Sequence, residues 1–154
     1  MRLTTRTRYG TRMLLDLAEH GRDNPVRIGD IAARQVISIK YLEKLTRPLK
    51  RAGLIKSVRG SKGGHLLAKA PGEISLSEIV RALEGDFQLV KCWDENSCCP
   101  RMSACRTSRL WGEVSATLDE KLASISLLDL LCDSVRGANA GGDGRPSLCG
   151  AKKS

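Results

Sequence analysis

VRIGDIAARQVISIKYLEKLTRPLKRAGLI, residues 26–55, contains two apolar periodicities that are separated by a short polar break. The first fits a short helix with apolar positions at Ile28, Ile31 and Ala32. The second fits a longer helix with apolar positions at Tyr41, Leu42, Leu45 and Leu49. Two such helices with a tight turn between them form a helix-turn-helix.

The ends of the second helix can be read from single residues. Ser38 can cap the first turn with its hydroxyl. Pro48 removes a backbone donor and crowds the preceding turn, so we expect a kink or an early end near Arg47.

The polar face of this second helix is strongly basic. Its cations are Lys40, Lys44, Arg47, Lys50 and Arg51, and Glu43 is the only acid. Lysine and arginine can contact phosphates or guanine edges, and the hydroxyls of Ser38 and Tyr41 can donate to phosphate. A merely solvated helix face normally mixes both signs, so we interpret the helix as a reader of double-stranded DNA.

Residues 54–68 give a β-hairpin signal. Two short apolar runs, 54–58 and 66–68, flank a glycine-rich loop that carries Arg59, Gly60 and Lys62. A hairpin after a helix-turn-helix makes a winged helix, whose basic tip can enter the minor groove. A glycine-rich loop can also hold a nucleotide phosphate, but no Walker-type spacing supports that alternative.

Three further helices are predicted outside this unit. Residues 5–20 form an amphipathic helix, and residues 75–86 form a packing helix that begins with a capping box at Ser75 and Glu78. Residues 109–131 contain a long helix with a four-residue apolar step, Leu110, Val114, Leu118 and Leu122, before a second capping signal at Ser126 and Asp129. A chain of this size has little core to cover that stripe, so we predict a homodimer through the long helix.

Charge is unevenly distributed along the chain. Residues 1–70 carry 16 Lys or Arg against 5 Asp or Glu, whereas residues 71–135 carry 6 against 11. This asymmetry suggests that the first half faces a polyanion. The N-terminal residues lack the apolar core of a signal peptide, and no segment is apolar enough to span a membrane, so we expect a cytoplasmic protein with reduced thiols.

Residues 91–111, KCWDENSCCPRMSACRTSRLW, form a cysteine segment with Cys92, Cys98, Cys99 and Cys105. The spacing lacks the paired knuckles of structural zinc sites. A loop with widely spaced thiols suits an iron-sulfur cluster, which thiolates surround. A thiol-disulfide switch and, less readily, zinc remain open alternatives.

In the order and spacing of five segments, the chain from residue 1 to about 131 resembles the Rrf-two family of winged helix-turn-helix transcriptional regulators, in its IscR-like and NsrR-like branches. The segments are MRLTTRTRYGTRMLLDLA, ISIKYLEKL, SVRGSKGGHLL, SLSEIVRALEG and the cysteine segment with its Trp111. The resemblance implies a homodimer, a recognition helix in the major groove, a wing in the minor groove with Arg59 and Gly60 at its tip, and a cluster held by Cys92, Cys98 or Cys99, and Cys105.

Two positions depart from the family pattern. Ser108 stands where the IscR branch has a histidine, and Arg8 stands where the nitric-oxide branch has an aspartate. The fourth ligand is therefore the second cysteine of the Cys98-Cys99 pair, Ser108, or a group from the partner chain. Arg8 instead joins the candidate DNA-binding residues.

The sequence thus predicts a mainly α fold with a small β-hairpin wing. We expect a winged helix-turn-helix DNA-binding domain at 1–70, a unit with the packing helix, cluster loop and dimerisation helix at 71–135, and a disordered tail at 136–154. The predicted function is a homodimeric DNA-binding repressor that senses redox or iron-sulfur status through a cluster, with 2Fe-2S favoured over 4Fe-4S. The alternatives are a cluster-free regulator that senses thiol oxidation or a partner and, less favoured, a redox enzyme or electron carrier.

Overall fold

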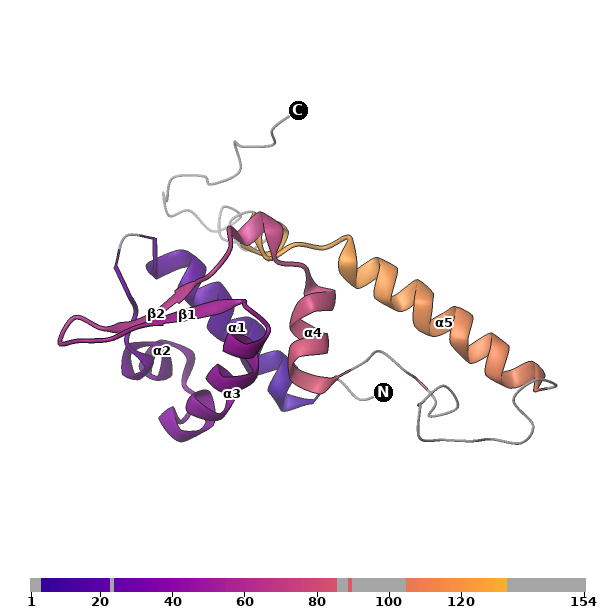
Figure 1. Cartoon of the computed structure of the whole chain (residues 1–154), viewed down its shortest axis with the longest axis horizontal. Coiled ribbons are helices and arrows are strands. Elements are labelled where there is room, and N and C mark those ends of the chain that lie inside the picture. Colours follow the sequence, from indigo (N-terminus) through magenta and orange to yellow (C-terminus); the bar gives the residue numbers. More distant parts are fainter. Residues whose placement is uncertain (1–3, 23, 86–88, 90–104, 133–154) are drawn as a thin grey trace, which may run out of the picture.

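The computed structural model describes residues 4–22, 24–85, 89 and 105–132 (Figure 1). Its elements in chain order are α1 (Thr5–His20), α2 (Ile28–Gln35), α3 (Ile39–Arg51), β1 (Ile55–Val58), β2 (Gly64–Leu67), η1 (Pro71–Glu73), α4 (Leu76–Glu84) and α5 (Arg106–Ala123). Residues 127–132 are also helical. The predicted mainly α fold with one β-hairpin is therefore confirmed. The predicted tail and most of the cysteine segment lie outside the described residues.

Helix α1 is the central element, and α4 packs closely against it. A Cβ atom added at Gly10 would lie 2.3 Å from Cδ1 of Leu83, so only glycine lets the two helices come this near. At the same end, the Glu84 carboxylate accepts hydrogen bonds from the hydroxyls of Thr4 and Thr7, the latter at 2.8 Å. The start of α1 is thereby fixed to the end of α4.

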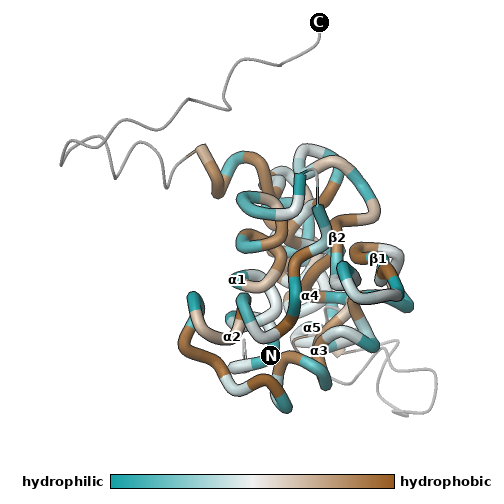
Figure 2. The backbone as a smooth tube through the Cα atoms, turned by 90° about the vertical axis from the view of Figure 1, so that its left-hand side faces the viewer, coloured by the Kyte–Doolittle hydropathy of each residue, from teal (hydrophilic) through white to brown (hydrophobic). Residues whose placement is uncertain are grey.

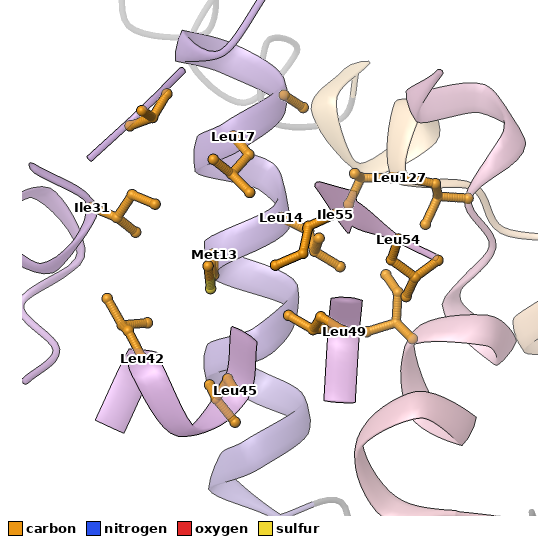
Figure 3. Close-up of a cluster of buried hydrophobic side chains, with 14 of the residues drawn as sticks. Met13, Leu14, Leu17, Ile31, Leu42, Leu45, Leu49, Leu54, Ile55 and Leu127 are labelled. Carbon is orange, nitrogen blue, oxygen red and sulfur yellow. The ribbon is translucent and has the colours of Figure 1, made fainter. Parts of the chain in front are cut away.

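One apolar cluster holds the described elements together. Met13, Leu14 and Leu17 of α1 form its centre and are at most 1% exposed. Figure 3 shows side chains from α2, α3, the start of the hairpin and the segment after α5 around this centre, including Ile31, Leu42, Leu45, Leu49, Leu54, Ile55 and Leu127. Hydrophobic and hydrophilic stretches alternate along the tube in Figure 2, as amphipathic helices around one core require.

The helix-turn-helix is built as predicted except at Pro48. Ser38 caps α3, its hydroxyl accepting from the Tyr41 N–H at 3.2 Å. Of the two outcomes expected at Pro48, the early end near Arg47 is wrong, because α3 continues to Arg51. The alternative, a kink in the helix, stays a prediction. Leu45 and Leu49 are both buried in the core, one on each side of Pro48, and this packing holds the helix together across the missing backbone donor.

The C-terminal elements return to the core through a short backbone bridge. The Leu127 N–H donates to the Ile74 carbonyl at 2.8 Å, and the Leu76 N–H donates to the Ile125 carbonyl at 2.9 Å. The predicted capping box is confirmed, since the Ser126 N–H donates to Asp129 Oδ2 at 2.9 Å and the Asp129 N–H donates to Ser126 Oγ at 3.1 Å. The long helix ends at Ala123, before this second box as predicted, but it begins at Arg106, three residues before the expected Arg109.

Helix α5 extends outward from the rest of the fold (Figure 1). It is attached to α4 by Asp119, whose carboxylate accepts from the Ser77 hydroxyl and from the Arg81 guanidinium. Among the described residues, no helix has the length and apolar character needed to cross a bilayer.

Candidate nucleic-acid interface and cysteine segment

The exposed face of α3 carries the cations that the sequence analysis selected. The helix buries Leu42, Leu45 and Leu49. Because side chains three and four positions apart share a helix face, this burial turns the intervening positions to solvent. The residues of this recognition face are Lys40, Lys44, Arg47, Lys50 and Arg51, and all are exposed. Within the described ranges, none of them takes part in an ion pair.

Tyr41 plays a packing role in addition to any contact with DNA. Its ring lies edge-on to Tyr9 of α1, with centroids 5.6 Å apart and planes at 86°. The guanidinium of Arg12 lies 5.6 Å from the Tyr9 centroid. Tyr41 is half-buried, so its ring fixes α3 to α1 and only part of it faces solvent.

The predicted hairpin is confirmed, with β2 beginning at Gly64, two residues before the expected Leu66. The strands are antiparallel, with Ile55 opposite Leu67 and Val58 opposite Gly64. The tip residues Arg59, Gly60 and Lys62 are all exposed. Gly60 has φ +114°, a conformation that L side chains rarely adopt, and its carbonyl accepts from the Gly63 N–H at 2.9 Å. The structure thus presents Arg59 and Lys62 on a tight, outward-facing turn.

Two contacts that sequence reasoning missed attach this wing to the start of α2. The guanidinium of Arg27 donates to the Ser61 carbonyl at 2.7 Å. Val26 and His65 exchange backbone hydrogen bonds of 2.9 and 2.8 Å. Burial, together with the charge of Lys50, lowers the pKa of His65, which favours the neutral ring. The wing is therefore coupled to the helix-turn-helix by more than the short connection after α3.

A buried carboxylate joins α1 to the end of α2, and no local pattern predicted it. Asp16 is 0% exposed and accepts from Arg34 Nη2 at 2.6 Å, from Arg34 Nε at 3.0 Å and from Gln35 Nε2 at 3.0 Å. Burial acts to raise the pKa of Asp16. The hydrogen bonds from Arg34 and Gln35 and the charges of Arg34 and His20 outweigh it, so the pKa is lowered.

Arg8 lies apart from these groups in sequence and is exposed on α1. No described hydrogen bond or ion pair links its side chain to α3 or to the wing. Its DNA-binding role stays a prediction.

Only one cysteine of the predicted ligand set falls within the described residues. Cys92, Cys98 and Cys99 lie outside them. Cys105 occupies the N-cap position of α5, and its Sγ lies 3.1 Å from the Thr107 hydroxyl. The hydrogen bond with Thr107, followed by the Ser108 backbone N–H, lowers the pKa of the Cys105 thiol. This environment favours the thiolate, the form that binds metals and reacts with oxidants.

Two described contacts involve residues near either end of the cysteine segment in the sequence, Leu89 and Ser108. Ser108 is 4% exposed, and its hydroxyl donates to the Cys105 carbonyl at 2.9 Å. Further along α5, the Ser115 hydroxyl accepts from the Leu89 N–H at 3.2 Å and donates to the Trp111 carbonyl at 2.7 Å. Among the described residues alone, no group of three His, Cys, Asp or Glu could hold a metal ion.

Part of the apolar stripe of α5 faces solvent. Leu110 is 52% exposed, Trp111 43% and Leu118 40%. Val114 and Leu122 are half-buried. Large apolar side chains repeated along one helix in this way indicate an interaction surface.

Comparison with known proteins gives consistent results. The sequence model of the Rrf2 family, described as "Iron-dependent Transcriptional regulator", matches residues 3–133. The protein named Protein rrf2 from Nitratidesulfovibrio vulgaris is 52% identical over 134 residues, which cover 87% of this chain and 89% of that protein.

Two solved structures are similar over most of their length. The T. potens IscR structure is 36% identical with a TM-score of 0.73, covering 92% of this chain and 94% of that one. The structure of CymR, the global cysteine regulator of B. subtilis, is 33% identical with a TM-score of 0.68, covering 85% of this chain and 96% of that one.

Proposed function

Since this chain belongs to the Rrf2 family of transcriptional regulators, the Rrf-two family of the sequence resemblance, we propose that it is a homodimeric DNA-binding repressor whose affinity for DNA depends on an iron-sulfur cluster. The family consists of regulators, so the chain is a transcriptional regulator and not a redox enzyme. As a regulator of transcription, the dimer would act in the cytoplasm. The observation that carries the DNA-binding part is the basic recognition face of α3, which makes no ion pair within the described residues, beside a basic wing.

In this proposal α3 enters the major groove and the wing tip contacts the adjacent minor groove. Lys40, Lys44 and Arg47 would contact phosphates or guanine edges. Arg59 and Lys62 would lie in the narrow minor groove. The Ser38 hydroxyl, which accepts from its own helix, keeps its hydrogen free to donate to phosphate. The contacts of Arg27 with the wing would hold the two binding elements in one orientation.

The cysteine segment would supply the cluster ligands. Cys92, Cys98 or Cys99, and Cys105 are the proposed thiolates, and a 2Fe-2S cluster is favoured over 4Fe-4S. The lowered pKa of Cys105 fits this role, because a ligating thiol must be deprotonated. A cluster bound here would supply a redox-sensitive and oxidant-sensitive link between the thiols.

Chain length permits Cys92 to reach Cys105. Cys105 and Ser115 are ten residues apart on α5, which at about 1.5 Å per residue is about 15 Å along the axis. Leu89 is anchored at Ser115, and the three residues to Cys92 can span about 10 Å. The remaining distance of about 5 Å would be covered by the two cysteine side chains and the group that they bind. One bridging group between Cys92 and Cys105 would therefore fix the segment along the first half of α5.

The fourth ligand would come from the second of the paired cysteines, from Ser108 or from the partner chain. Ser108 lies one turn from Cys105, but its hydroxyl hydrogen is engaged by the Cys105 carbonyl. Ligation through its oxygen would require that this hydrogen bond be given up.

The dimer would form through α5. Leu110, Trp111 and Leu118 are too exposed for a helix that acts alone, and a second copy of the same stripe would cover them. Two recognition helices must then match half-sites about 34 to 36 Å apart. Release of the cysteine segment from α5 would alter the tilt of the paired helices and hence the affinity for DNA.

A cluster-free regulator is the second candidate. The likeness to a structure titled as a global cysteine regulator supports it, as does the thiolate-favouring position of Cys105. In that case oxidation of the thiols, or a partner, would alter the same segment.

One purification separates the two candidates. Protein prepared without oxygen should be brown and contain iron and acid-labile sulfide, whereas a colourless protein with neither would favour the cluster-free regulator. DNA binding is tested independently by its salt dependence, because each phosphate contact contributes about 0.9 to the slope of log K against log salt. A flat slope would reject the DNA interface.

A further inference from the structure

A pocket lies where the wing, the end of α1 and the segment after α5 meet. Its volume is about 540 Å³, within the range of roughly 300 to 1,000 Å³ that is typical of small-molecule sites. None of its described lining residues belongs to the recognition face of α3. The lining residues that the argument uses are Leu17, Arg22, Lys56, Leu66, Gly72 and Leu128.

The walls of this pocket are mostly apolar and come from α1, the wing, η1 and the helical residues after α5. Leu17 belongs to the buried core, while Leu66 of β2 and Leu128 are half-buried and turn part of their surface to the pocket. Gly72 adds an open stretch of backbone, where an added Cβ atom would meet only Leu128 Cδ2, at 3.6 Å. Such walls suit the apolar body of a small molecule.

Among the described lining residues of the pocket, the charged groups are all positive. Arg22, Lys56 and Lys69 line it, and no acidic residue is among its described lining. Lys69 is engaged by Glu78 at 2.8 Å. Arg22 and Lys56 take part in no ion pair within the described part of the chain. These two exposed cations therefore remain available to an anion.

We propose that this pocket binds a small amphipathic carboxylate, with its apolar body against Leu66 and Leu128 and its carboxylate toward Arg22 and Lys56. Lys56 and Leu66 belong to the two wing strands, and Leu128 belongs to the segment that follows α5. A bound molecule would bridge the wing to that segment. On the premise of the proposed function, occupancy would then change the affinity of the wing for DNA.

Binding can be tested on the full chain without DNA, using octanoate as the probe and octylammonium as a probe of equal length and opposite charge. Octanoate should shift the backbone amide NMR signals of Leu66, Gly72 and Leu128, and octylammonium at the same concentration should not. Equal shifts with both probes, or no shift at these residues with octanoate, would overturn the proposal.

Variants distinguish the pocket from general surface binding. Arg22→Ala with Lys56→Ala should weaken octanoate binding about tenfold, whereas Lys62→Ala, which removes an exposed cation at the wing tip, should leave it unchanged. Gly72→Leu should fill the pocket and abolish binding, with its thermal unfolding midpoint showing that it folds. Unaltered binding in both pocket variants would contradict the assignment.

The effect of octanoate on DNA affinity is measured separately. Octanoate at saturation should change DNA affinity by about fivefold or more, the lower end of typical coupling between sites, and Gly72→Leu should lose this response. Octanoate binding with no change in DNA affinity would refute the coupling. A protein that binds octanoate but no DNA at all would contradict the proposed function while leaving the pocket assignment standing.

Discussion

Replacing Arg34 with Ala should destabilise the fold far more than the loss of one surface ion pair. Asp16 is fully buried, and Arg34 binds both oxygens of its carboxylate. Removing the cation leaves a buried charge with Gln35 and, at 3.8 Å, His20 as its remaining neighbours. Breaking such a pair from one side costs about 3 to 5 kcal/mol. Because Arg34 is itself 35% exposed, we expect the low end of that range, about 3 kcal/mol.

A second substitution isolates the buried charge as the cause. Asp16→Asn in the Arg34→Ala background removes the charge and keeps the shape, so the double variant should be more stable than Arg34→Ala alone. Lys69→Ala is the matched control. Lys69 and Glu78 are about 40% exposed, and such a surface pair contributes at most about 1 kcal/mol.

The pH dependence of the free energy of unfolding tests the same buried charge independently. The pKa of Asp16 is lowered in the native protein, so its stabilising effect is present above the ordinary carboxyl pKa and is lost as the pH falls through the lowered value. In Arg34→Ala, burial raises the pKa of Asp16. Lowering the pH then protonates this carboxyl and removes the buried charge that destabilises the variant. The stability difference between the native protein and Arg34→Ala should therefore be largest near pH 7 and narrow toward pH 4.

Urea denaturation followed by circular dichroism measures all of these differences. In thermal unfolding at neutral pH, the midpoint should fall by about 12 °C for Arg34→Ala, from about 3 kcal/mol at about 4 °C per kcal/mol. If Arg34→Ala were no less stable than Lys69→Ala, or if Asp16→Asn lowered its stability further, the account of the buried carboxylate would fail.

Three further results are expected. Val36 ends α2 with φ +54° and is 89% exposed, so Val36→Gly should raise the free energy of unfolding by about 1 kcal/mol through relief of backbone strain; a loss of stability in urea denaturation would refute this. Arg59→Ala should weaken DNA binding and lower the salt slope by about 0.9, and anisotropy titrations with an unchanged slope would exclude Arg59 as a phosphate contact. Leu118→Glu should convert the dimer to monomers in sedimentation analysis, while Glu113→Ala, at an exposed position on the same helix, should not; two dimeric variants would rule out the proposed interface.

Much of the fold could be predicted because single residues mark its boundaries. Ser38 and Ser75 begin α3 and α4 with their own side chains, and the glycine-rich loop with Gly60 fixes the hairpin. These signals are local, so the sequence displays them directly. Pro48 misled for the same reason, since its local penalty is offset by the buried leucines on both sides.

Other features depend on contacts between distant residues. Asp16 looks like any acidic residue on a helix, and only the packing of α2 on α1 brings it to Arg34, 18 positions away. The link from Arg27 to the wing spans 34 positions. The pocket is likewise assembled from α1, the wing, η1 and the helical residues after α5. No periodicity or spacing encodes such long-range pairs, so the recognition face was predictable and its supporting contacts were not.

The central claim is that a cysteine-bound cluster controls DNA binding, and a single anaerobic titration tests it most directly. A DNA duplex selected from a random pool is titrated with the native protein, analysed for iron and sulfide, before and after a chelator removes the iron. The account predicts iron and sulfide in equal amounts and a change in DNA affinity of about tenfold or more on their removal. Equal affinity before and after removal, or a native protein with neither iron nor sulfide, would contradict it.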